Sequence, residues 1–160
     1  MPRRLILLIG LVACGRIQPT DNDMEILDPI VNPSPSTFVD KLPLVSGTSK
    51  GGKGSGGGAA SKFDFEYHDF SMTGVSRVGL TEPANTNNIA NFEVSVAQGR
   101  VRLYFADPKK GYRYIEATPG QPARITGAML RPPPGPAYYV LLEAVGSEAS
   151  GVACHIWRKG

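Results

Sequence analysis

The sequence predicts an all-β fold over residues 63–160, an antiparallel β-sandwich of jelly-roll or Ig-like type with about seven or eight strands. Three observations predict it. Apolar and polar residues alternate in short runs, turn-forming Gly and Pro separate these runs, and no stretch has the period of an amphipathic helix. This segment also holds 12 of the 13 aromatic residues of the chain, as expected of the part that builds a packed core.

Three runs show the alternation clearly. Residues 63–67, 92–96 and 101–105 place apolar side chains at every second position, so each run is expected to bury one face and expose the other. Gln98-Gly99 is typical of a tight hairpin, which predicts that the second and third runs are joined as a hairpin. Further strands are expected at 70–75, 112–117, 124–130, 137–145 and 152–158, with Gly- and Pro-rich turns between them.

The first 13 residues have the layout of a bacterial secretion signal. Two arginines precede an apolar run of about nine residues, which is too short for the roughly 20 residues that span a bilayer. The run ends in Leu11-Val12-Ala13-Cys14, which resembles the lipobox of bacterial lipoproteins. The resemblance implies that the signal is removed, that Cys14 carries diacylglycerol through a thioether, and that its new amino group can receive a further chain such as palmitate.

This resemblance predicts where the protein is located. Two or three acyl chains on one residue hold a protein at a membrane, whereas a single chain gives marginal binding. We therefore expect an extracytoplasmic protein whose membrane partner is reached through the lipid on Cys14. Gly15 stands where an inner-membrane retention signal would have Asp, which favours the outer membrane in a host with two membranes and the outer face of the cell membrane otherwise. The alternative is an ordinary signal peptide that ends before a cysteine by chance.

Residues 14–62 are expected to form a disordered linker between the lipid and the domain. Pro residues punctuate its first part, and its last part is rich in Gly and Ser. Phe38 is its only aromatic residue, so it has too little apolar area to offset the entropy cost of ordering. Two short apolar islands, 24–27 and 38–42, are of a kind that linkers commonly tolerate, and the alternative is that either docks on a partner or adds a strand to the domain.

The composition limits the function classes. Charged residues make up 19% of the chain and the formal net charge is only +3, so we expect no nucleic-acid partner, which would need a clustered basic face. Two cysteines cannot form a disulfide framework or a cysteine-rich zinc site. No nucleophile-elbow or His-Glu-x-x-His motif appears, and we expect neither a catalytic residue nor a cofactor.

Two small groups of reactive side chains have simple structural interpretations. Glu66 and His68 share one face of the first strand, and His155 on the last strand could join them as a metal site if the two strands pair. We favour exposed polar residues on a solvent-facing surface, with no metal. Cys154 alternates in phase with the apolar residues of its strand, so it is expected to be buried and inert, on the opposite face from His155.

The second half of the chain has a recognisable order of features. They are the hairpin at Gly99, the strand ending in Asp107-Pro108, the turn Pro119-Gly120, the strand at 138–143 and the final Trp157. This order is similar to that of small secreted bacterial β-sandwich domains, most of them uncharacterised. The resemblance implies export and a sandwich fold, and it carries no catalytic residue. The proline run at 132–136 departs from the simple turn of that family, and we interpret it as a rigid connector, with a recognition site for a partner as the alternative.

The candidate binding surface is aromatic and consists of Tyr104, Tyr112, Tyr114, Tyr138, Tyr139, His155 and Trp157. Aromatic faces can stack on sugar rings, but tyrosines also commonly cover the solvent faces of antiparallel strands. The favoured function is a non-enzymatic cell-envelope protein that presents a β-sandwich for protein interaction or a structural role. A carbohydrate- or cell-wall-binding module with a glycan partner is the alternative, and a metal-dependent or thiol enzyme is a distant third.

Overall fold

The computed structural model describes residues 32–59, 62–80, 89–107, 111–129 and 138–158. The strands are β1 (Thr37–Val39), β2 (Thr48–Ala59), β3 (Lys62–Thr73), β4 (Val75–Leu80), β5 (Ile89–Ser95), β6 (Val101–Asp107), β7 (Gly111–Ala117), β8 (Ala123–Met129), β9 (Tyr138–Ala144) and β10 (Ala149–Arg158). In these ranges there is no helix of the length and apolar character that crossing a bilayer requires. Cys14 and the rest of the expected signal sequence lie outside the described residues.

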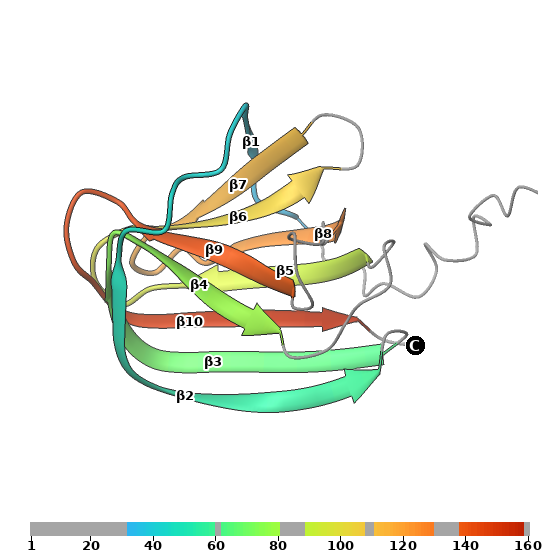
Figure 1. Ribbon diagram of the computed structural model, residues 1–160, viewed down its shortest axis with the longest axis horizontal. Helices are drawn as coiled ribbons and strands as arrows, with labels where there is room; N and C mark the ends of the chain where they lie inside the picture. Colours follow the sequence, from blue (N-terminus) through green and yellow to red (C-terminus); the bar gives the residue numbers. More distant parts are fainter. Residues whose placement is uncertain (1–31, 60–61, 81–88, 108–110, 130–137, 159–160) are drawn as a thin grey trace, which may run out of the picture.

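Two antiparallel sheets of five strands each form an unclosed β-sandwich, which confirms the predicted fold class (Figure 1). The first, called here the β6 sheet, has the strand order β4-β9-β6-β7-β1. The second, the β10 sheet, has the order β8-β5-β10-β3-β2. One backbone bridge, Ala106 opposite Met129, connects β6 to β8 where the two sheets meet.

The core lies between the sheets and is built from the alternating apolar positions of both. Phe92, Leu103, Ile115 and Ile156 are among its fully buried side chains. The rings of Phe92 from β5 and Phe105 from β6 stack across the core with their centroids 5.9 Å apart. Period-two alternation on two facing sheets therefore produces one continuous core, as the sequence predicts.

The expected hairpin between residues 92–96 and 101–105 is wrong. β5 pairs with β8 and β10, whereas β6 pairs mainly with β7 and β9 in the other sheet. Gln98 pairs with Ser150 instead, and Gly99, with a φ of 86°, turns the chain from one sheet to the other. Alternation determines which side chains face the core. The same alternation is expected whether two successive strands pair in one sheet or lie in different sheets, because each sheet of a sandwich buries one face.

The Gly-rich part of the expected linker is a strand, so the prediction of disorder is wrong for residues 48–59. β2 forms one edge of the β10 sheet and pairs with β3 along its length (Figure 1). Gly54 stands opposite Tyr67 and Gly56 opposite Phe65. A Cβ at Gly54 would lie 3.0 Å from Cδ1 of Tyr67, so the missing side chains leave room for aromatic rings against the β2 backbone. The domain therefore begins before the expected boundary at residue 63.

The second apolar island adds a strand to the domain, which the sequence left open as an alternative to a segment of the linker. β1 pairs with β7, and the following chain carries Leu42 onto the outer face of the β6 sheet. There Leu42 packs against a small second cluster formed by Val75, Tyr104 and Leu141. With β1, β2 and the unpredicted strand β4, the described residues form ten strands, above the expected number, although two of the expected strands are joined in β3. The first island lies outside the described residues.

β3 joins two expected strands into one continuous strand. An irregularity at Asp69, whose φ is 60°, changes which positions of β3 face the core. Phe65 is buried before it and Phe70 is buried after it, although the two lie an odd number of residues apart. Gly151, with a φ of 61°, lies at the matching irregularity in β10. The paired irregularities keep the apolar side chains of both strands directed inward.

Candidate functional site

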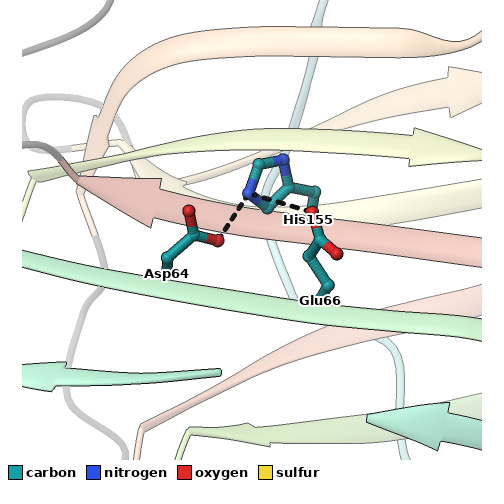
Figure 2. Close-up of side chains that lie close together, drawn as sticks. All are labelled: Asp64, Glu66 and His155. Carbon is teal, nitrogen blue, oxygen red and sulfur yellow. Dashed lines mark hydrogen bonds and ion pairs between the residues drawn. The ribbon is translucent and has the colours of Figure 1, made fainter. Parts of the chain in front are cut away.

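Asp64, Glu66 and His155 meet on the outer face of the β10 sheet, where β3 and β10 pair (Figure 2). Nε2 of His155 lies 2.8 Å from Oδ1 of Asp64 and 3.9 Å from Oε1 of Glu66. The strand register places Glu66 directly opposite His155 and places Asp64 two residues along the same face. One imidazole therefore lies within reach of two carboxylates.

The strands that carry Glu66 and His155 pair with each other. A cluster of these side chains was expected only if the two strands paired. Its third member differs from the expected one. The ligand-type atoms that lie within 4.8 Å of one another belong to Asp64, Glu66 and His155, and His68 is not among them. His68 directly precedes the irregularity at Asp69, where the regular register of β3 with β10 is interrupted.

A shallow depression of about 200 Å³ adjoins this cluster. It is lined by Glu66, Tyr67, His68, Glu93, Ser95, Ala153, Cys154 and His155. Ser95 and Ala153 stand opposite each other in the register of β5 and β10, and their small side chains leave the space between the larger ones. Oε2 of Glu93 forms an ion pair with Nε of Arg124 at 2.8 Å, so this carboxylate already has a cation beside it.

Trp157 supports the imidazole of His155. The two rings stack with centroids 4.1 Å apart and planes 18° from parallel. Trp157 is only 8% exposed, and Asn91, its partner in the register with β5, is fully buried. The indole therefore orients His155 and presents little of its own surface to a ligand.

The predicted aromatic surface is divided between the two sheets. Tyr104, Tyr112 and Tyr114 lie on the outer face of the β6 sheet, and His155 and Trp157 lie on the outer face of the β10 sheet. The structure therefore does not bring these residues together into one surface. Tyr138 and Tyr139 belong to β9, but their side chains lie outside the described residues.

Tyr104 belongs to a polar network on the outer face of the β6 sheet. Its hydroxyl donates a hydrogen bond of 2.5 Å to Oε2 of Glu143. Nε of Arg102 lies 2.8 Å from Oε2 of Glu116, and its guanidinium lies 4.6 Å from the ring centroid of Tyr114. Burial disfavours the charged form of Arg102, but its hydrogen bonds to Glu116 and Tyr104 outweigh burial and raise its pKa. The polar and charged groups of these side chains are used in contacts with one another, so their role is structural.

The Tyr104 hydroxyl makes the stability of the fold depend on alkaline pH. Burial and the hydrogen bond to Glu143 raise the pKa of Tyr104 to about 12, from 10.0. Above pH 10 the unfolded chain releases this proton while the folded chain keeps it, so the free energy of unfolding falls as the pH rises from 10 to 12. In urea titrations, the decrease in the free energy of unfolding between pH 10 and pH 12 is expected to be smaller in Tyr104→Phe than in the parent, by up to about 2 kcal/mol. The variant Tyr112→Phe, on the same face, is the control, and an equal change in both variants would contradict the assignment.

Cys154 points into the core, as its phase with the apolar positions of its strand predicts. It is 1% exposed, and burial raises the pKa of its thiol to about 12. His155, the next residue, lies on the outer face of the same strand. The thiol and the imidazole therefore cannot form a nucleophile and base pair, and Cys154 is a packing residue.

A second recess lies between the edge strands β2 and β4 and has a volume of about 240 Å³. It is lined by Ser49, Gly51, Gly52, Lys53, Gly54, Tyr67, Phe70, Arg77 and Val78. Because the β2 residues beside Tyr67 and Phe70 are glycines, no β2 side chain fills the space over these rings. We call this recess the edge groove. The sequence did not predict this groove, although a Gly-rich run directly before an alternating aromatic strand was the available signal for it.

Comparison with known proteins adds no relative from which a role could be transferred. No protein-family model matches the chain, and neither a curated protein nor a solved structure matches it.

Proposed function

We propose that the protein is a lipid-anchored, non-enzymatic component of the bacterial cell envelope whose β-sandwich binds an extended acidic segment of another protein. The lipobox resemblance at residues 11–14 supports the anchor and the extracytoplasmic location. The buried state of Cys154 and its separation from His155 support the absence of thiol chemistry. The observation that carries the binding function is the edge groove with its exposed edge strand.

β2 is suited to accept an added strand. Among the described strands it pairs only with β3, so its other edge keeps backbone N–H and C=O groups available over a strand of 12 residues. All of its described side chains are exposed, and Gly at many positions removes the side chains that would hinder an approaching backbone. Addition of an extended segment to such an edge is a common mode of peptide recognition, because main-chain hydrogen bonds supply affinity without a preformed cavity.

The charge of the edge groove favours an acidic partner. Lys53 and Arg77 line it, and no carboxylate is among the described residues of its lining. Phe70 and Val78, both largely buried, form the apolar floor beside these cations. An extended segment that alternates acidic and apolar side chains would place its charges against the cations and its apolar groups against the floor. A partner of this chemistry is the occupant we propose.

A carbohydrate- or cell-wall-binding module remains the alternative proposal. Such a module usually offers exposed aromatic faces to sugar rings. Tyr104 is 6% exposed and Trp157 is 8% exposed, so these two aromatic residues offer little stacking surface. The structure therefore favours the protein-binding proposal, and retention on glycan is an outcome of the test.

The binding function is tested by photocrosslinking in cells. A photoreactive side chain in place of Lys50, which is exposed on β2, is expected to capture a protein through an extended acidic segment identified by mass spectrometry. Lys53→Glu is expected to reduce the yield at least about fivefold, since it reverses the charge of a residue that lines the groove. Lys41→Glu is the matched control, because Lys41 is exposed in the loop between β1 and β2 and does not line the groove.

Three results would contradict the binding proposal: no captured protein, a yield that Lys53→Glu leaves unchanged, or crosslinks only to the acidic residues 21–28 of the same chain. Retention of the purified chain on peptidoglycan or exopolysaccharide, without a captured protein, would favour the alternative. The anchor is tested separately. Cys14→Ala is expected to move the protein from the membrane fraction to the aqueous fraction, and persistence in the membrane would contradict the lipid assignment.

A further inference from the structure

The cluster of Asp64, Glu66 and His155 has the composition and spacing of a metal site. One imidazole nitrogen and two carboxylate oxygens are ligands that Zn²⁺ and similar ions accept in proteins. Tetrahedral coordination at about 2.0–2.2 Å separates neighbouring ligand atoms by about 3.3–3.6 Å. The observed separations of 2.8 Å and 3.9 Å from His155 Nε2 to the two carboxylates lie on either side of that range. Small rotations of exposed carboxylates would therefore place the ligand atoms around an ion.

The backbone and the neighbouring indole hold these groups in position. Asp64 and Glu66 project from alternate positions of β3, and His155 projects from the paired strand β10, so the sheet register fixes all three Cα positions. The stack of His155 on Trp157, with centroids 4.1 Å apart, restrains the plane of the imidazole. Because the ligands come from strands and not from a loop, little ordering is needed when an ion binds.

The electrostatic surroundings favour a cation. Two carboxylates lie near one imidazole, and in the described ranges of the chain no ion pair other than those with His155 involves Asp64 or Glu66. Asp64 and Glu66 are exposed, so an ion can approach from solvent. The adjoining depression, lined by Glu66 and His155, leaves room for water molecules that would complete the coordination.

We propose that Asp64, Glu66 and His155 bind one divalent transition-metal ion of the Zn²⁺ class on the outer face of the β10 sheet. Nε2 of His155, a carboxylate oxygen of Asp64 and a carboxylate oxygen of Glu66 are the protein ligands. This site lies on a sheet face and is distinct from the edge groove, so it does not depend on the proposed protein-binding function.

The test is a zinc titration of the full-length chain in competition with a chromophoric chelator. Every sample carries Cys14→Ala, so that the Cys14 thiol cannot bind the metal. We expect saturable binding of one Zn²⁺ per chain. Asp64→Asn, Glu66→Gln and His155→Gln are each expected to weaken binding at least about tenfold, because each removes one of three protein ligands.

Two matched controls separate this site from non-specific binding to acidic residues. Asp69→Asn removes the same charge from the same strand, and Asn tolerates the positive φ of that position. His68→Gln removes the histidine that lines the depression without belonging to the cluster. Both variants are expected to bind Zn²⁺ like the parent.

A second measurement identifies the ligand directly. In NMR spectra of the imidazole nitrogens, added Zn²⁺ is expected to shift the Nε2 signal of His155 and to leave that of His68 in place. The absence of saturable binding would overturn the proposal, as would binding that survives His155→Gln or that His68→Gln abolishes and Asp64→Asn does not. Urea unfolding of each metal-free variant confirms that lost binding does not reflect a lost fold.

Discussion

Phe92→Ala is expected to lower the free energy of unfolding by about 3–5 kcal/mol, the cost of removing a large aromatic side chain from a closed core. Phe92 is 0% exposed and stacks on Phe105 with ring centroids 5.9 Å apart. It lies on β5, inside the β10 sheet with a partner strand on each side, so the backbone cannot move easily to fill the cavity. The measurement is equilibrium unfolding in urea.

The control is Phe38→Ala, which removes the same side chain from an exposed position. Phe38 is 47% exposed on β1 and lies over the guanidinium of Arg113, with 4.7 Å between the ring centroid and Cζ. Its truncation is expected to cost about 1 kcal/mol or less, the worth of an exposed cation–π contact and a little apolar area. Comparable losses in the two variants would contradict the assigned core.

Gly56→Ala is expected to destabilise the pairing of β2 with β3 by about 2–3 kcal/mol. The φ of Gly56 is 140°, a conformation that residues with a Cβ rarely adopt. An added Cβ would also lie 2.2 Å from the carbonyl oxygen of Asp64 and 2.7 Å from Cα of Phe65. Both partners are backbone atoms, so no side-chain rotation can relieve the contact.

Gly57→Ala is the matched control, since an added Cβ there meets no atom within 4 Å. Hydrogen exchange of the amides in β2 and β3 is the sensitive measurement, because an edge strand can open without global unfolding. Exchange in β2 should become at least about tenfold faster in Gly56→Ala and stay near the parent value in Gly57→Ala. Equal exchange in the two variants would show that the glycines are not needed for the strand.

Sequence patterns predicted the parts of the structure that depend on local alternation. The buried faces around Phe92 and Leu103 and the inward position of Cys154 follow from period-two alternation, since a strand directs successive side chains to opposite faces. The outer position of His155 follows in the same way. Lipidation of Cys14 remains a prediction from the lipobox resemblance.

Two errors share one physical cause. Propensity treats Gly as a poor strand former, but β2 forms because the rings of β3, such as those of Phe65 and Tyr67, pack against a backbone without side chains. The Gln98-Gly99 turn has hairpin composition, yet the partners of its flanking strands lie in different sheets. In both cases the deciding contacts come from residues distant in sequence.

The candidate site illustrates the same division. Alternation placed Glu66 and His155 on solvent-facing positions, and it left open whether their strands would pair. The register of β3 with β10 then brought Asp64 to His155, whereas His68, next to the irregularity at Asp69, does not belong to the cluster. The available signal for that irregularity was the odd spacing between Phe65 and Phe70, since period-two alternation separates residues on one face by an even number of positions.

The sequence by itself determined that this protein has an all-β sandwich domain with an inert buried thiol. The alternation of apolar and polar residues along each strand is enough to show which side chains face the core. Only the tertiary structure decided which strands are neighbours, that Gly-rich residues 48–59 belong to the sheet, and that Asp64, Glu66 and His155 converge. Strand order and register depend on contacts between distant segments, and a local pattern is compatible with several such arrangements.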